Sequence, residues 1–100
     1  MKEVVIVSAV RTPMGSFGGI FSSIPATKLG SYAIKGAIEK CGIDKEIIDE
    51  VFMGCVLPAG LKQCPARQAM LGAKIPSSTG AVTINKACGS GMQATIFGAD

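Results

Sequence analysis

The sequence contains no histidine and no tryptophan, and only 5% of its residues are aromatic. Histidine is a common zinc ligand, and the four cysteines, at positions 41, 55, 64 and 88, include no Cys-x-x-Cys pair. The ten basic residues are scattered, whereas nucleic-acid binding usually shows a basic stripe interleaved with stacking aromatics. The sequence therefore predicts neither a metal site nor a nucleic-acid partner.

Charged residues are also scarce, at 17% of the chain against about 25% in an average soluble domain. A small domain has a large surface relative to its core and normally needs more charge. The 48% hydrophobic content therefore indicates a part of a larger α/β structure, whose faces other segments cover. Residues 96–100 lie in an apolar, helix-like run without a stop signal, so we expect the chain to be truncated.

The sequence has no long hydrophobic run. The longest, Val4 to Val10, is interrupted by Ser8 and is far shorter than the roughly 20 residues that span a bilayer. Glu3 offsets Lys2, and no small-residue cleavage site follows, so a signal peptide is not predicted. We expect reduced thiols, no membrane partner and a cytoplasmic location, with targeting by a carboxyl-terminal address left open.

The hydrophobic pattern predicts alternating strands and helices. Val4–Val7 is a continuous β-branched run, typical of a strand buried on both faces. Apolar residues at every fourth position predict an amphipathic helix over 26–41, ended by Gly42, and Asp44 is expected to cap a short turn through Ile48. We expect further strands at 51–57 and 81–85, a helix at 65–71, and a buried helix of mostly small residues from residue 89. The pattern is that of an α/β domain with a largely parallel sheet and no internal repeat.

The segment between residues 11 and 25 is rich in glycine and proline and is predicted to be a loop. Its Gly15–Gly19 stretch suggests a phosphate cradle at first sight. It has neither the Rossmann glycine spacing nor the Lys-Ser/Thr ending of a P-loop, so a plain loop is the better interpretation.

The most informative stretch places Cys88 between a predicted strand end and the start of a predicted helix. Backbone N–H groups at a helix start carry partial positive charge, which stabilises a thiolate and can hold the oxygen of a tetrahedral intermediate. Gly89 and Gly91 allow substrate and backbone to approach closely. An inert core cysteine remains the alternative, because no base is visible beside the thiol.

Three ordered segments of the chain resemble the thiolase family. Asn-Lys-Ala-Cys-Gly-Ser-Gly-Met-Gln-Ala at 85–94 is similar to the family's active-site signature, usually Asn-x-x-Cys-Gly/Ala-Ser-Gly-hydrophobic. Residues 5–17, with Ser-Ala-Val-Arg-Thr-Pro, resemble its opening strand and loop, and Pro-Ala-Arg-Gln-Ala at 65–69 resembles its short helix. The resemblance covers nearly the whole chain.

The resemblance implies a thiolase-like α/β fold, with residues 1–100 as the N-terminal part of the first of two similar halves and a mostly parallel mixed sheet. It implies that Cys88 takes an acyl group from acyl-CoA, that the enolate of a second acetyl-CoA attacks this thioester, and that coenzyme A is a substrate or product rather than a cofactor. The family's histidine base, its second cysteine and most of the residues that hold coenzyme A lie downstream. Family members are dimers or tetramers, and we expect these 100 residues alone to be inactive.

Cys64 departs from the family pattern, which mostly has another residue, often asparagine, at this position. A regulatory disulfide with Cys88 in the assembled enzyme is one hypothesis, and a neutral loop substitution is the one we favour. Arg67 is expected to make a structural salt bridge or bind a carbonyl rather than a ligand. Lys86 is either a solvated lysine or a charge that helps to lower the pKa of the thiol.

The remaining sulfur-containing side chains are interpreted as core packing. These are Cys41 and Cys55, together with Met53, Met70 and Met92.

Three classes of function stay open. The first is a thiolase, of the short-chain biosynthetic type that makes acetoacetyl-CoA, with a ketoacyl synthase as the related enzyme. The second is a non-catalytic fragment that acts at most in subunit association. The third is a small redox protein built on Cys88, for which the sequence offers no resolving-cysteine motif.

Overall fold

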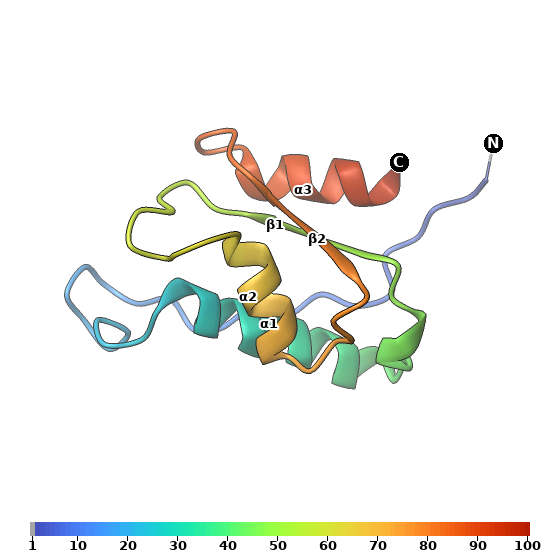
Figure 1. Ribbon diagram of the computed structural model, residues 1–100, viewed down its shortest axis with the longest axis horizontal. Coiled ribbons are helices and arrows are strands. Elements are labelled where there is room, and N and C mark those ends of the chain that lie inside the picture. The colour runs from blue at the N-terminus through green and yellow to red at the C-terminus, as the bar shows by residue number, and fades with distance from the viewer. Residues whose placement is uncertain (1) are drawn as a thin grey trace.

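The computed structural model describes residues 2–100 (Figure 1). From residue 26 onward, the predicted order of helices and strands is confirmed. The elements are α1 (Ala26–Cys41), the 3₁₀ turn η1 (Lys45–Ile47), β1 (Glu50–Gly54), α2 (Pro65–Gly72), β2 (Gly80–Ile84) and α3 (Ser90–Ala99).

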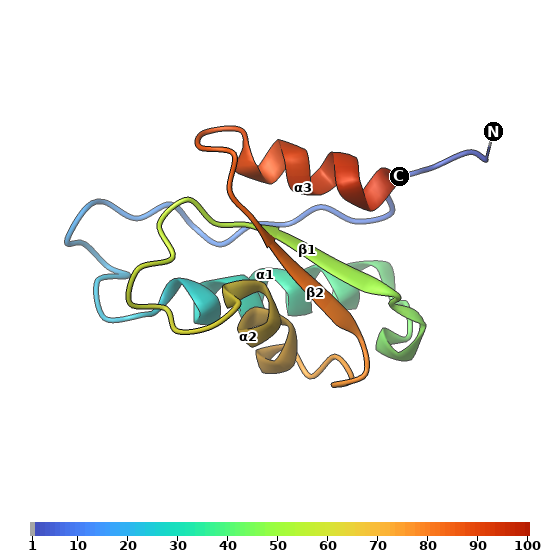
Figure 2. The same ribbon diagram turned by 45° about the horizontal axis from the view of Figure 1, so that its top comes forward.

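The described residues form a three-layer structure around a parallel pair of strands. β1 and β2 pair in register from Glu50 with Gly80 to Gly54 with Ile84, and α2 lies in the crossover between them. β1 ends at Gly54, three residues before the predicted end, and β2 has the predicted length but lies one residue earlier, ending at Ile84. Helices α1 and α2 cover one face of the pair, and α3 covers the other (Figures 1 and 2). This arrangement brings the carboxyl end of β2 directly to the start of α3.

The predicted first strand, Val4–Val7, is not formed. Residues 2–16 run as an extended segment outside the two-stranded sheet, and these four side chains are 60–79% exposed. A strand is defined by hydrogen bonds to a neighbour, and the segment 4–7 pairs with neither β1 nor β2. The loop predicted for 11–25 is confirmed, since 17–24 consists of turns and bends. The β-branched run thus indicates a strand, but it pairs with no other segment of residues 2–100.

Helix α1 begins and ends where its sequence predicts. Gly42 follows its last residue in the left-handed conformation, with φ of 71°, and its N–H donates to the Ile38 carbonyl. Glycine adopts this conformation without a steric penalty, which is why it commonly ends helices. The predicted cap also forms, because Asp44 Oδ1 accepts the Glu46 N–H at 2.9 Å and starts η1.

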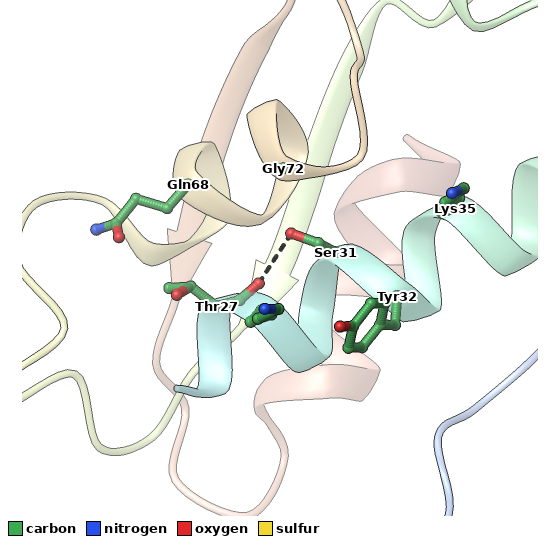
Figure 3. A pocket seen from close by; sticks show the side chains of 7 residues that line it. Thr27, Ser31, Tyr32, Lys35, Gln68 and Gly72 are labelled. Atoms are coloured by element: carbon green, nitrogen blue, oxygen red, sulfur yellow. Dashed lines mark hydrogen bonds between the residues drawn. The ribbon is translucent and has the colours of Figure 1, made fainter. Parts of the chain in front are cut away.

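Helices α1 and α2 are joined through Ser31 (Figure 3). Its buried hydroxyl lies within hydrogen-bond distance of the Ala69 carbonyl, at 2.9 Å, and of the Thr27 carbonyl, at 3.1 Å. Gly72 faces the same hydroxyl, and a Cβ added at Gly72 would collide with Ser31 Oγ. An open groove of about 380 Å³ runs beside this contact, lined by residues that include Tyr32 and Lys35. Close packing at this point depends on the absence of a side chain at Gly72.

The core is small and lies between α2 and the sheet. Met70 is fully buried, together with Val51 and Ile75, so its prediction as core is confirmed; Met53 is half-buried against the same cluster. Met92 is 73% exposed, and its prediction as core is wrong. It projects from α3 on a face that no described segment covers.

Helix α3 is also less buried than predicted. Only Ser90 and Ala94, on its sheet-facing side, are buried. Ile96 and Phe97 are exposed, although the Phe97 ring lies 6.3 Å from that of Phe52 between centroids. The helix therefore carries apolar side chains that this chain leaves exposed.

Candidate active site

Cys88 lies in the turn that connects β2 to α3, between Ile84 and Ser90. Its side chain is exposed and its thiol is free. The position expected from the sequence, at a strand end and directly before a helix, is therefore the observed one. The N–H groups of Gly89 and Ser90 donate to carbonyls of the turn itself, at 3.0 and 3.1 Å. The first turn of a helix carries partial positive charge, so the turn presents an accessible thiol directly before the positive end of α3.

Asn85 makes one hydrogen bond within this turn and one to the segment after β1. Its Oδ1 accepts the Ala87 N–H at 3.0 Å, and its Nδ2 donates to the Val56 carbonyl at 3.2 Å. The first bond closes a local Asx-type turn, and the second crosses to a segment 29 residues earlier in the chain. One side chain thus sets both the shape and the position of the turn.

Ser90 holds the turn from the other end. It is 3% exposed, and its Oγ accepts the Lys86 N–H at 2.8 Å and donates to the Ala87 carbonyl at 2.6 Å. Ala87, directly before Cys88, has φ of 46°, a left-handed conformation that costs a residue with a Cβ some stability. The hydrogen bonds of Asn85 and Ser90 surround this strained residue.

Gly54 lets the start of α3 approach β1. A Cβ at Gly54 would lie 2.7 Å from the Ser90 carbonyl carbon and from the Gly91 nitrogen. The sequence analysis missed this residue. Its signal was available, because glycine at the interior or end of a strand often marks a close approach of another backbone.

The side chain of Lys86 contacts helix α3 rather than the thiol of Cys88. Its ammonium donates to Gln93 Oε1 at 3.0 Å, on α3. Within residues 2–100 no hydrogen bond joins Lys86 Nζ to Cys88. The hydrogen bond to Gln93 connects the turn to α3. The electrostatic role considered for Lys86 stays a prediction.

Cys64 lies on the other side of the sheet, directly before α2. It has φ of 40°, and its Sγ lies 3.5 Å from Thr83 Oγ1 and 3.8 Å from the Ala81 carbonyl oxygen. The hydrogen bond from the Thr83 hydroxyl lowers the pKa of the Cys64 thiol below its ordinary value of 9.0, assisted by the N–H and charge of Arg67, while burial opposes the shift. Cys64 and Cys88 are both free thiols here, so the disulfide between them stays a prediction.

The other two cysteines are half-buried rather than core residues. Cys41 Sγ lies 3.6 Å from the Ile38 carbonyl oxygen, and Cys55 follows β1, where its N–H donates to the Ile84 carbonyl at 2.9 Å. The structural role expected of Arg67 is confirmed. Its guanidinium donates to the carbonyls of Ser77, at 3.1 Å, and Thr79, at 3.4 Å.

Across residues 2–100, no three histidine, cysteine or acidic side chains come together as metal ligands would. In the same residues, no helix has the length and apolar character needed to cross a bilayer.

The observed site therefore consists of an accessible thiol, a rigid turn and the start of a helix. These elements suit a nucleophile that forms a covalent intermediate. Such a nucleophile also needs a base, and the sequence has no histidine to supply one.

A parallel βαβ unit that delivers a cysteine to a helix start, in an Asn-x-x-Cys-Gly-Ser-Gly turn, is the arrangement expected for the first part of a thiolase. Residues 4–100 match the family model described as thiolase, N-terminal domain, and the chain belongs to this family. The resemblance and the fold class inferred from the sequence are thereby confirmed.

Individual relatives agree with this assignment. The chain is 65% identical to an acetyl-CoA acetyltransferase of Schizosaccharomyces pombe and 62% identical to the mitochondrial acetyl-CoA acetyltransferase of Homo sapiens, over 97% of its own length in both cases. The crystal structure of Acat5 thiolase from Ascaris suum in complex with coenzyme A superposes with a TM-score of 0.95 at 46% identity, over 98% of this chain. The chain spans 23–26% of the length of these three proteins.

Proposed function

We propose that this chain is the N-terminal part of a full-length thiolase, an acyl-CoA acyltransferase in which Cys88 carries the acyl group. The observation that carries the proposal is the position of Cys88, exposed in a turn at the start of α3 and within the family's signature segment. The acetyl-CoA acetyltransferases among its relatives favour acetyl-CoA as the substrate, and acetoacetyl-CoA as the product of condensation.

In the proposed reaction, the Cys88 thiolate attacks the carbonyl carbon of acetyl-CoA. A new carbon–sulfur bond forms, the bond to the sulfur of coenzyme A breaks, and the leaving thiolate takes up a proton. The enolate of a second acetyl-CoA then attacks the acetyl-cysteine, forming a carbon–carbon bond and releasing the Cys88 thiolate. Thiolysis is the reverse sequence, with coenzyme A as the nucleophile.

The residues of this chain perform part of that chemistry. In this proposal, the positive end of α3 stabilises the oxygen of the tetrahedral intermediate. The general base and the second proton-transferring cysteine come from the longer protein, as the family resemblance implies. We therefore propose that the full-length protein is active as a dimer or tetramer and that these 100 residues alone are inactive.

The test is peptide mapping by mass spectrometry after incubation with acetyl-CoA, on the full-length protein and on this chain. We expect an acetyl adduct on Cys88 of the full-length protein, retained in Cys64→Ser and absent in Cys88→Ser. Binding of coenzyme A without any adduct at Cys88 would refute the acyl-enzyme mechanism. An adduct at full yield on the 100-residue chain would refute its proposed inactivity.

The second candidate is a non-catalytic fragment that associates with full-length subunits. It is favoured by the exposed apolar side chains of α3, which this chain does not cover. Co-expression of a tagged chain with the full-length protein tests it, since the candidate requires that the two purify together at a fixed ratio.

We also propose a cytoplasmic location. Several relatives are mitochondrial acetyl-CoA acetyltransferases, so the location of this protein has to be measured. Fractionation of source cells with antibody detection decides between the two compartments.

A further inference from the structure

The turn that carries Cys88 is held by two side chains that the proposed reaction does not use. We infer that Asn85 and Ser90 are positioning residues, which aim the Cys88 thiol by keeping Ala87 in its left-handed conformation. This inference rests on the proposed function, since it concerns the acylation of Cys88. It adds two residues whose effect on the reaction passes through the backbone rather than through contact with substrate.

Ala87 has a strained backbone conformation. With φ of 46°, this residue occupies a region that side chains other than glycine rarely adopt. Such a conformation persists only where the surroundings over-determine it, and functional sites are where it is commonly found. Without restraint, Ala87 would return to negative φ and rotate the peptide that leads into Cys88.

Both backbone groups of Ala87 are restrained by side chains. Its N–H donates to Asn85 Oδ1 at 3.0 Å, and its carbonyl accepts from Ser90 Oγ at 2.6 Å. Ser90 Oγ also accepts the Lys86 N–H at 2.8 Å, so it binds two successive residues that precede Cys88. The restraint is therefore applied on both sides of the strained φ.

The restraint is anchored to β1 and the segment after it. Asn85 Nδ2 donates to the Val56 carbonyl, and the backbone of Ser90 lies against Gly54. Since Ser90 is 3% exposed, its hydroxyl does not exchange its partners for water. The thiol of Cys88 is thereby oriented relative to the sheet, and misplacement of a reacting group by about 1 Å costs on the order of 10²-fold in rate.

The test compares Asn85→Ala and Ser90→Ala in the full-length protein with two matched controls. Thr95→Ala removes a hydroxyl from the same helix that bonds only the Gly91 carbonyl, at 3.1 Å. Gln68→Ala removes an amide that holds a different loop, through the Gln63 carbonyl at 2.7 Å. We measure the rate of Cys88 acetylation, kcat and KM, and the rate of alkylation by iodoacetamide as a function of pH.

We expect acetylation and kcat to fall by about 10-fold to 100-fold in Asn85→Ala and Ser90→Ala, with KM within about twofold of wild type. Both controls should retain the wild-type rates. Asn85→Asp keeps the acceptor for the Ala87 N–H but loses the donor to Val56, so its acetylation rate should lie between those of Asn85→Ala and wild type.

A second-site change separates positioning from a general loss of stability. Glycine adopts left-handed backbone without penalty, so Ala87→Gly should restore part of the rate when combined with Ser90→Ala. Urea denaturation of the same variants gives the folded fraction under assay conditions, and a Ser90→Ala protein that is fully folded yet slow has lost positioning rather than stability. We expect the double variant to acetylate faster than Ser90→Ala alone.

The outcomes distinguish this inference from the proposed function. If wild-type protein forms no adduct at Cys88, the proposed function fails, and the positioning role fails with it. If wild type is acetylated, and Asn85→Ala, which changes an exposed residue, stays within about twofold of Gln68→Ala, only the positioning role is overturned. A uniform rise in KM at constant kcat would also overturn it, because that pattern indicates lost substrate binding.

Discussion

Gly54 is the point at which a single methyl group should disturb both the fold and the site. A Cβ at this position would lie 2.7 Å from the Ser90 carbonyl carbon and the Gly91 nitrogen, and 2.9 Å from the Ser90 oxygen. All three are backbone atoms at the start of α3, so no side chain can rotate away. Gly54→Ala must therefore push α3 and β1 apart.

The size of the effect follows from these distances. Ordinary contacts between carbon atoms begin near 3.4 Å, so α3 and β1 must separate by about 0.7 Å, which is 3.4 minus 2.7. Inserting a methyl group into a packed contact of this kind typically costs about 1–3 kcal/mol. Because Ser90 is part of the moving backbone, we also expect the acetylation rate of Cys88 to fall by about 10-fold or more.

The assay is urea denaturation of the full-length protein, followed by measurement of the acetylation rate in the absence of denaturant. Gly98→Ala is the matched control, because it lies on the same helix and its Cβ would meet nothing closer than Phe52 Cδ2 at 3.9 Å. Alanine in place of helical glycine should raise stability by up to about 1 kcal/mol. Equal effects of the two substitutions would show that the contact at Gly54 does not govern the packing of α3.

Two further predictions concern the contacts around α2. Thr83→Val removes the hydrogen bond that lowers the pKa of Cys64, so pH-dependent alkylation with peptide mapping should show the midpoint of Cys64 shifted to higher pH. An unchanged midpoint of Cys64 alkylation would contradict the role of Thr83. The folded-state pKa of Cys64 lies below the ordinary 9.0, so ionisation of this thiol stabilises the wild-type fold above pH 9.0. That contribution to the free energy of unfolding is lost as pH falls through the folded-state pKa. Gly72→Ala should cost about 1–3 kcal/mol in urea denaturation, because its Cβ meets Ser31 Oγ, and adding Ser31→Ala should recover part of that loss. Strictly additive costs would show that the two side chains do not collide.

Short stretches of the sequence predict the local features of this chain, such as the ends of its helices and the place of Cys88. The four-residue apolar period of α1 and the glycine after it predict the helix and its end, because both depend on residues within a turn or two. Pro65 likewise predicts the start of α2. The position of Cys88 before α3 follows from the same kind of local pattern, since a strand, a turn with glycine and a helix are consecutive in the chain.

Contacts between distant segments could not be predicted in this way. The pairing of Cys64 with Thr83 and the approach of α3 to Gly54 join residues 19 or more positions apart. The sequence analysis therefore missed both, and it treated Asn85 and Ser90 only as members of a signature. Their bonds to Ala87 and Val56 become visible once the turn is folded against β1.

The amino-acid sequence by itself determined the family, the order of elements from residue 26 onward and the place of the candidate nucleophile, because periodicity, caps and motifs act over a few residues. The tertiary structure alone decided which apolar residues are covered. Val4–Val7 has the composition of a buried strand and Met92 that of core, yet both are exposed. Burial and strand formation require a second surface, and whether one is present depends on packing between segments far apart in the chain.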